Sequence, residues 1–180
     1  MTLATNFSTL NMANVDLNAV WSSASVAGTY AENVQPSAPF AAGTRTNMQN
    51  GGTAIYCKLS TGGATGQYYC IVAPSSNWGA AVMMSNSVGA LGDPVGSFLG
   101  SAAAVSGDYG WVQISGTGSI FSNTASANVA MQSTATAGEV DDASGSGTKV
   151  LTNLWLTAAN AGSAAVTACE MQNPTVGATN

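Results

Sequence analysis

Apolar and polar side chains alternate along several short stretches of the chain, and turn residues separate these stretches. The clearest stretch is Tyr109–Ile114, which follows the turn Ser106–Asp108. Side chains of a strand alternate between two faces, so this pattern predicts a strand. Gly116 and Gly118 are typical turn or close-packing residues, and we expect them to bound a further strand at Ser119–Phe121.

The same pattern recurs along most of the chain. Glycine, proline, asparagine and serine mark turns at intervals of about 8–12 residues, which is typical of a sandwich or barrel. The sequence therefore predicts an all-β fold, a sandwich or barrel of short antiparallel strands, with a jelly-roll-like arrangement as one option. The other predicted strands are Thr53–Leu59, Gln67–Ala73, Ala80–Met84, Val95–Leu99, Val129–Gln132, Ala137–Val140, Lys149–Leu156 and Ala164–Glu170.

Some details follow from strict alternation and from turn chemistry. In Lys149–Leu156, we expect Val150, Thr152, Leu154 and Leu156 to share one face, with Leu151, Asn153 and Trp155 on the other. The pair Asn173-Pro174 is expected to end regular structure and to open a polar tail. Two alanine-rich segments, Ala102–Val105 and Ala158–Ala165, are candidates for a helical turn.

The first 48 residues differ from the rest, because their apolar residues occur singly among Asn, Ser and Thr. We therefore divide the chain into an extended N-terminal arm, residues 1–48, and an all-β domain, residues 49–180. The arm is expected to lie along its own domain or a neighbouring subunit, with Phe7, Leu10 and Trp21 as contact residues. The alternative is a disordered tail, since chain termini are commonly loose. Residues 10–20 fit a strand or a short helix equally well.

Charged residues make up only 6% of the chain, against about a quarter in an ordinary soluble domain. The surface must therefore consist largely of hydroxyls, amides and small side chains. Free monomers usually keep more charge for solubility. Such a composition suits a protein that spends its life packed in an assembly.

The few charges that exist also restrict the partners. The formal net charge is −5, and Arg45, Lys58 and Lys149 are the only basic residues. Binding to nucleic acid or to anionic membranes needs a cationic surface, so neither partner is expected. No apolar run approaches the length of a membrane-spanning helix. The N-terminal residues carry no positive charge and no apolar core, so we expect no signal peptide.

Candidate chemistry is sparse. The chain has no histidine, which removes Ser-His-Asp and Cys-His catalysis and the commonest zinc ligand. Cys57, Cys70 and Cys169 lack the close spacing of zinc sites and are interpreted as buried thiols, although Cys57 and Cys70 fall in neighbouring predicted strands that can face each other. The carboxylates of Glu139 and residues 141–142 suit either Ca²⁺ or, more simply, a solvated loop. We expect no enzyme activity, no metal and no cofactor.

One strand face has two interpretations. Tyr109, Trp111 and Gln113 lie on the same side of the predicted strand, and aromatic side chains are enriched at the centres of protein interfaces. We therefore treat these residues as candidate partner contacts. The competing interpretation is that they form one of the packed faces of a sandwich.

Two segments together resemble a known group of proteins. Gly92-Asp93-Pro94-Val95-Gly96, an alanine-rich link and then Gly107-Asp108-Tyr109-Gly110-Trp111-Val112-Gln113-Ile114-Ser115-Gly116 resemble the decoration, or cement, proteins of tailed bacteriophages. Residues 50–172 follow the order of elements in that group, and the N-terminal 48 residues match nothing in it. The resemblance implies an all-β fold, often trimeric, on the outer capsid surface of the virion.

The same resemblance implies a function and a partner. It implies a structural protein that binds the major capsid protein and stabilises contacts between its subunits, made in the cytoplasm of a host bacterium. It implies no chemistry and assigns no functional residue. The alternative function is a carbohydrate- or receptor-binding β module on the virion surface or tail, which exposed aromatic side chains would serve.

Overall fold

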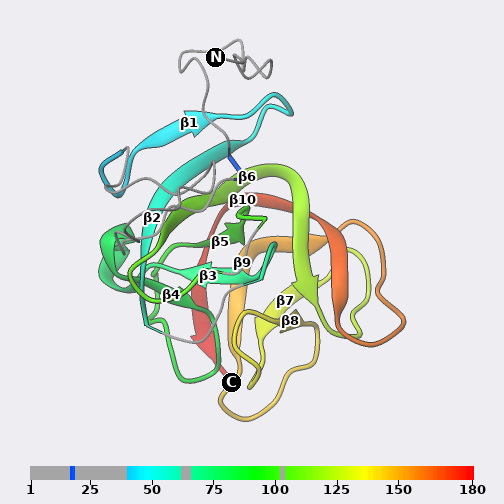
Figure 1. Ribbon diagram of the computed structural model, residues 1–180. Helices are drawn as coiled ribbons and strands as arrows, with labels where there is room; N and C mark the ends of the chain where they lie inside the picture. Colours follow the sequence, from blue (N-terminus) through cyan, green and yellow to red (C-terminus); the bar gives the residue numbers. More distant parts are fainter. Residues whose placement is uncertain (1–16, 19–39, 62–65, 102–103) are drawn as a thin grey trace.

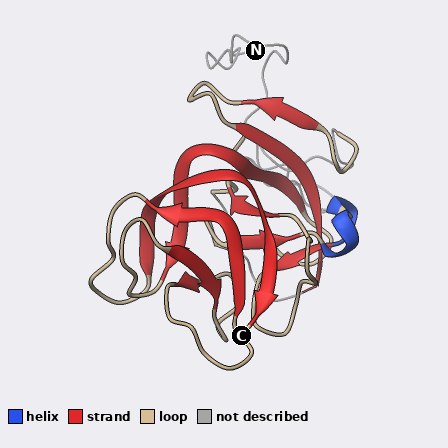
Figure 2. Ribbon diagram, turned by 180° about the vertical axis from the view of Figure 1, so that it is seen from behind, coloured by secondary structure: helices blue, strands red, loops and turns tan. Residues whose placement is uncertain are grey.

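The computed structural model describes residues 17–18, 40–61, 66–101 and 104–180 (Figure 1). Strands dominate this part of the chain, so the all-β prediction is confirmed, and two short 3₁₀ turns, η1 (Pro74–Ser76) and η2 (Trp78–Ala80), lie at one side (Figure 2). The strands are β1 (Arg45–Asn47), β2 (Thr53–Thr61), β3 (Cys70–Val72), β4 (Ala81–Met83), β5 (Val95–Phe98), β6 (Tyr109–Ser122), β7 (Ala130–Ser133), β8 (Val140–Asp141), β9 (Lys149–Leu156) and β10 (Ala165–Thr179).

The strands join into one sheet that closes on itself twice. β2, β4, β3, β5 and β6 pair in that order, and β6 pairs back onto β2, which makes a first ring. β6, β10, β9, β7 and β8 pair in that order, and β8 pairs back onto β6, which makes a second ring. The β2–β4 and β6–β8 pairings are parallel, and the others are antiparallel as the sequence predicts. β6 is therefore common to both rings.

β6 is one continuous strand, so the prediction that Gly116 and Gly118 separate two strands is wrong. Its first half pairs with β2 and β5, and its second half pairs with β10. Gly116 adopts a positive φ of 85°, and a Cβ there would lie 2.7 Å from the Cα of Gly52. The glycine therefore permits a left-handed backbone and a close strand approach within β6. The strand turns from one ring into the other without being interrupted.

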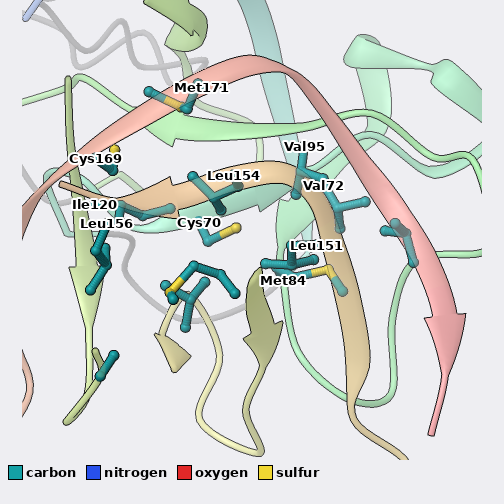
Figure 3. Close-up of a cluster of buried hydrophobic side chains, with 14 of the residues drawn as sticks. Cys70, Val72, Met84, Val95, Ile120, Leu151, Leu154, Leu156, Cys169 and Met171 are labelled. Atoms are coloured by element: carbon teal, nitrogen blue, oxygen red, sulfur yellow. The ribbon is translucent and has the colours of Figure 1, made fainter. Parts of the chain in front are cut away.

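β3, β4 and β5 form a middle layer that is buried on both faces. On one face Ile71 and Phe98 pack with side chains of β2 and the first half of β6, in what we call the first core. On the other face Cys70 and Val95 pack with β9, β10 and the second half of β6, in the second core (Figure 3). Alternation in these strands therefore serves two cores, and neither face is left to solvent.

β9 has the predicted bounds, but its predicted alternation is wrong. Leu151, Leu154 and Leu156 all point into the second core. The step between the first two buried positions is therefore three residues, and the step between the last two is two residues. Asn153, between them, has a positive φ of 60°, and the register with β7 and β10 shifts at this position. A bulge at this position moves Leu151 onto the face of Leu154.

β10 continues to Thr179, so the predicted end of regular structure at Asn173-Pro174 is also wrong. Asn173 has a positive φ of 51°, and the pairing with β9 shifts between Met171 and Thr175. Proline is tolerated in strands at such bulges, because no ladder hydrogen bond is required of its nitrogen there. Asn180 then bonds back to Thr148 through its backbone, which ties this end of the chain to the second ring.

The remaining differences are local. β3 starts only at Cys70, because Tyr68 has a positive φ of 67° and breaks the predicted run from Gln67. The helical turn proposed for Ala158–Ala165 is absent from this described segment, and Ala102–Val105 is described only in part. β1 lies inside the range that the sequence assigns to the arm and pairs with β2. Residues 40–48 therefore lie against the domain.

Candidate functional site

The most distinctive feature outside the two cores is a layer of aromatic side chains on the outer face of the first ring. Tyr56 of β2 and Trp111 of β6 lie opposite each other in register, with ring centroids 5.1 Å apart. Tyr109 stacks on Tyr56 at 5.9 Å, and the Lys58 Nζ lies 5.6 Å from the centre of the Tyr109 ring. Together with Ala54 and Leu99, these rings form a cluster separate from both cores, which we call the aromatic platform.

Most of the side chains that cover the platform precede β2 in the chain, and Tyr68, which follows β2, also packs on it. The Phe40 ring lies 5.4 Å from the rings of both Tyr56 and Trp111, and Met48 and Leu17 pack on the same cluster. Next to Leu17, the Asn18 carbonyl accepts hydrogen bonds from the Ser101 backbone nitrogen at 2.9 Å and from its Oγ at 3.1 Å. Tyr56 and Trp111 are fully buried as a result.

The buried centre of the platform, formed by Tyr56 and Trp111, carries no charge and is shielded from solvent. Burial raises the pKa of the Tyr56 hydroxyl, and the neighbouring Cys57 and Tyr109 raise it further, so this hydroxyl stays protonated. The Trp111 Nε1 is buried and makes no hydrogen bond with the described residues. An unpaired buried donor costs about 1–3 kcal/mol, so an acceptor brought to this atom would be stabilising.

The structure buries most of the predicted contact face on β6. Trp111 is 0% and Gln113 2% exposed among the described residues, and Tyr109 is half-buried. Trp111 packs in the aromatic platform, and contact of these three residues with a partner stays a prediction. The other predicted contact residues, Phe7, Leu10 and Trp21, lie outside the described residues and stay predictions.

Gln113 has a structural task at the bend of β6. Its Nε2 donates to the carbonyl oxygens of Ser115 at 3.0 Å, Thr117 at 3.1 Å and Gly116 at 3.4 Å. A Cβ at Gly118 would lie 2.5 Å from the Gln113 Oε1, so only glycine leaves room for the amide. The side chain thus links three consecutive carbonyl groups of β6 around Gly116, the residue with a positive φ.

The cysteines behave as buried structural thiols. All are buried and free, as the sequence predicts, and burial raises the pKa of both Cys57 and Cys169 to about 12. Cys57 lies in the first core and Cys70 in the second, so the facing pair considered from the sequence does not form. The nearby Cys169 raises the pKa of Cys70 further. Thiols held in this way are weak nucleophiles.

The acidic segment does not assemble a metal site. Among residues 17–18, 40–61, 66–101 and 104–180, no group of three or more Cys, Asp or Glu side chains is arranged to hold a metal ion. Asp142 instead accepts from the Ser126 backbone nitrogen at 2.8 Å, which lowers its pKa. Burial raises the pKa of Glu139 and of Asp141. The segment stabilises its loop through hydrogen bonds from backbone nitrogens to its carboxylates.

The two segments that carry the family resemblance form turns and strands. The Asp93 carboxylate accepts from the backbone nitrogens of Ser75 at 2.8 Å and Ala90 at 2.6 Å, and Asp108 accepts from Val105 at 3.0 Å. These aspartates close the turns before β5 and β6, which pair with each other. The Gly-Asp pairs were read from the sequence only as turns, and their carboxylates are what hold those turns.

The sequence did not single out the cover of the platform. Leu17 was one of several scattered apolar residues, and nothing marked Phe40, Met48 or Ser101 as its neighbours. The best available signal was Phe40, an isolated aromatic residue a short distance before β1.

Comparisons with protein-family models and with curated proteins give no match to this chain. No helix in the described part is long and apolar enough to cross a membrane.

Proposed function

We propose that this protein is a structural component of a phage virion that binds the outside of the capsid shell and stabilises contacts between major capsid subunits. The observation that carries the proposal is the scarcity of charge, 6% of all residues. The resemblance of residues 92–96 and 107–116 to decoration proteins supports it, and these residues build the β5–β6 pairing around which the first ring forms.

The structure makes the available surface even less charged than the composition indicates. Asp93 and Asp108 direct their carboxylates to backbone nitrogens, as described above, and both are buried. The Lys149 Nζ donates to the carbonyl oxygens of Val88 at 2.8 Å and Gly89 at 2.6 Å. Several of the few charges are thus used inside the fold. Contacts to a partner must rest on shape, apolar area and neutral hydrogen bonds.

Such a surface suits a clamp across subunit boundaries. A standard protein interface buries roughly 1,600 Å², and several interfaces in one symmetric oligomer, most simply a trimer, bind with avidity when the geometry allows simultaneous contact. The shared strand and shared middle layer give a body in which the two rings cannot separate without exposing a core. A rigid body loses little conformational entropy on binding.

The test is attachment to empty capsid shells that lack the protein, measured by co-sedimentation at low salt and at about 1 M NaCl. Screening acts on charged pairs, so attachment carried by neutral contacts survives high salt. Retention of most of the bound protein at about 1 M NaCl is the expected result. Release at that salt, or no attachment at either salt, contradicts the proposal.

The alternative, a glycan- or receptor-binding β module, is favoured by one observation. Trp155 of β9 is partly exposed, whereas Trp78 and Trp111 are buried. An exposed aromatic ring can stack on a sugar, so glycan-array binding that Trp155→Ala abolishes would favour this function. Capsid attachment that the same substitution leaves unchanged would favour the structural one.

A further inference from the structure

The aromatic platform is closed by two covers that differ in how they are attached. Phe40 and Met48 flank β1 and lead directly into β2, so they are fixed to the platform they cover. Leu17 and Asn18 reach the platform through residues 19–39. A connection of that length can extend to roughly 70 Å, well beyond the platform itself.

The contacts made by the second cover are transferable. They include the packing of the Leu17 side chain on the cluster and the two hydrogen bonds from Ser101 to the Asn18 carbonyl. None of them depends on which copy of the chain supplies Leu17. A segment joined by a long connection can make identical contacts on a neighbouring molecule, which is the usual origin of exchanged dimers and rings.

The platform also has an unused donor. The Trp111 Nε1 is fully buried next to this cover and finds no acceptor among the described residues. Residues 1–16 precede Leu17 directly and are rich in Asn, Ser and Thr, whose side chains and carbonyl groups are acceptors. The sequence that precedes Leu17 therefore contains acceptor groups of the kind that the Trp111 Nε1 lacks.

We infer that the aromatic platform is the docking site for the N-terminal segment of a second copy of this chain, with Leu17 as its apolar anchor and the Asn18 carbonyl bound to Ser101. Each copy gives its segment to one neighbour and receives one from another, which produces a closed ring of copies when the rotation closes. This inference rests on the homo-oligomer in the proposed function. It requires no capsid protein, so its failure and that of capsid attachment are measured separately.

Disulfide trapping distinguishes exchange from a contact within one chain. One variant carries Asn18→Cys and a removable tag that adds mass, and the other carries Ser101→Cys without a tag. The two are co-expressed, purified together and oxidised. The Asn18 and Ser101 backbones are joined by a 2.9 Å hydrogen bond, so thiols at these positions are close enough to pair. The expected product is a disulfide-linked pair of one tagged and one untagged chain, identified by mass spectrometry.

Two controls make the result decisive. Leu91 is 80% exposed and does not belong to the platform, so Leu91→Cys co-expressed with Ser101→Cys measures chance collisions. Adding Leu17→Asp to the tagged chain should reduce the trapped pair about tenfold, the change expected for a loss of roughly 1.4 kcal/mol. Leu91→Asp in the same chain should leave it unchanged.

The single chain that carries both Asn18→Cys and Ser101→Cys supplies the opposing outcome. If it closes its disulfide within one chain while the co-expressed pair gives no more linked product than the Leu91 control, the segment binds its own domain and the inference is overturned. Absence of any disulfide in both experiments also overturns it, because the Asn18–Ser101 contact would then not exist.

Discussion

The two cores of this protein are built from different materials around the same strands. The first core contains aromatic side chains, Trp78 and Phe98, and small residues such as Ala73 and Ala81. The second core has no aromatic member among the described residues and is filled by valines, leucines, methionines and two thiols (Figure 3). In the first core, large aromatic rings pack where alanine and glycine leave room for them. In the second core, flexible methionine side chains fill irregular gaps between the strands.

This difference shows how β6 can pack against two cores of different composition. In the first ring, a Cβ on Gly110 would lie 2.6 Å from the Phe98 ring, so the ring occupies the room that glycine leaves. In the second ring, the bulges of β9 and β10 adjust which residues face inward. β6 serves both because Gly116 and Gln113 change its direction between them. The middle layer then couples the two cores into one unit.

The largest expected effect comes from removing one side chain from each core. Phe98→Ala in the first core should lower the free energy of unfolding by about 3–5 kcal/mol, and Leu154→Ala in the second by about 2–5 kcal/mol. Because the middle layer contacts both cores, each variant should unfold in one transition. Denaturant titration followed by circular dichroism and by tryptophan fluorescence should give the same midpoint.

A second unfolding transition in either variant would show that the two rings unfold as independent domains. Tryptophan reports on both parts, since Trp78 lies in the first core and Trp155 on the second ring. Single-tryptophan variants would then identify the ring that unfolds first.

The bend of β6 gives the next largest effect. Gln113→Leu keeps the size of the side chain but removes the Gln113 donor from the carbonyls of Ser115 and Thr117, of which Thr117 keeps Asn50, and should cost about 1–3 kcal/mol. Gln67→Leu is the matched control, because among the described residues the Gln67 Nε2 donates to a single carbonyl, that of Leu99 at 3.2 Å. Thermal unfolding of both variants measures the difference. Equal losses would remove the special role of the bend.

The bulge in β9 predicts a smaller effect whose size depends on the replacement. Asn153 has a φ of 60°, which glycine adopts freely and a β-branched residue resists. Asn153→Val should destabilise the protein by about 1–2 kcal/mol, whereas Asn153→Gly should be close to neutral. Asn153 is exposed, so burial does not confuse the comparison. A valine variant as stable as the glycine variant would show that the bulge relaxes.

The smallest effect is a pH dependence in the second ring. Burial raises the pKa of Glu139 from its ordinary 4.5, so the folded protein binds this proton more tightly than the unfolded chain. Its contribution is therefore most favourable at acid pH and is lost as pH rises above about 4.5 through the folded pKa. Glu139→Gln should raise the stability at pH 7 relative to wild type and change it little at pH 4.

Asp142 provides a control of opposite sign. Hydrogen bonds from Ser126 lower its pKa from 3.8, so its contribution is present at neutral pH and is lost as pH falls below that value. Asp142→Asn should therefore lower stability at pH 7. If both variants change the stability in the same direction at pH 7, the assigned environments are wrong.

The sequence predicted what period-two alternation and turn residues control. The bounds of β9 and nearly those of β5, and the inward face of β2 with Ile55, Cys57 and Leu59, follow from these local signals. The continuity of β6 does not, because a glycine that ends a strand and a glycine that bends it look alike. The bulges at Asn153 and Asn173 depend on pairing with strands distant in sequence.

The platform shows the same limit for the candidate site. Trp111 and Tyr109 were correctly placed on one face of β6, but alternation says nothing of what covers that face. The cover comes from Leu17, Phe40 and Met48, which have no periodic relation to it. Only the tertiary structure brings a residue from position 17 next to one from position 111.

The double burial of the middle layer has a consequence for synthesis on the ribosome. A nascent chain that has emerged as far as β6 contains every strand of the first ring, whereas β7, β9 and β10 follow it. Until those strands arrive, Cys70, Val95 and their neighbours present an apolar sheet to solvent. That interval is when the growing chain is most prone to sticking to other chains, and faster translation of its last third would shorten it.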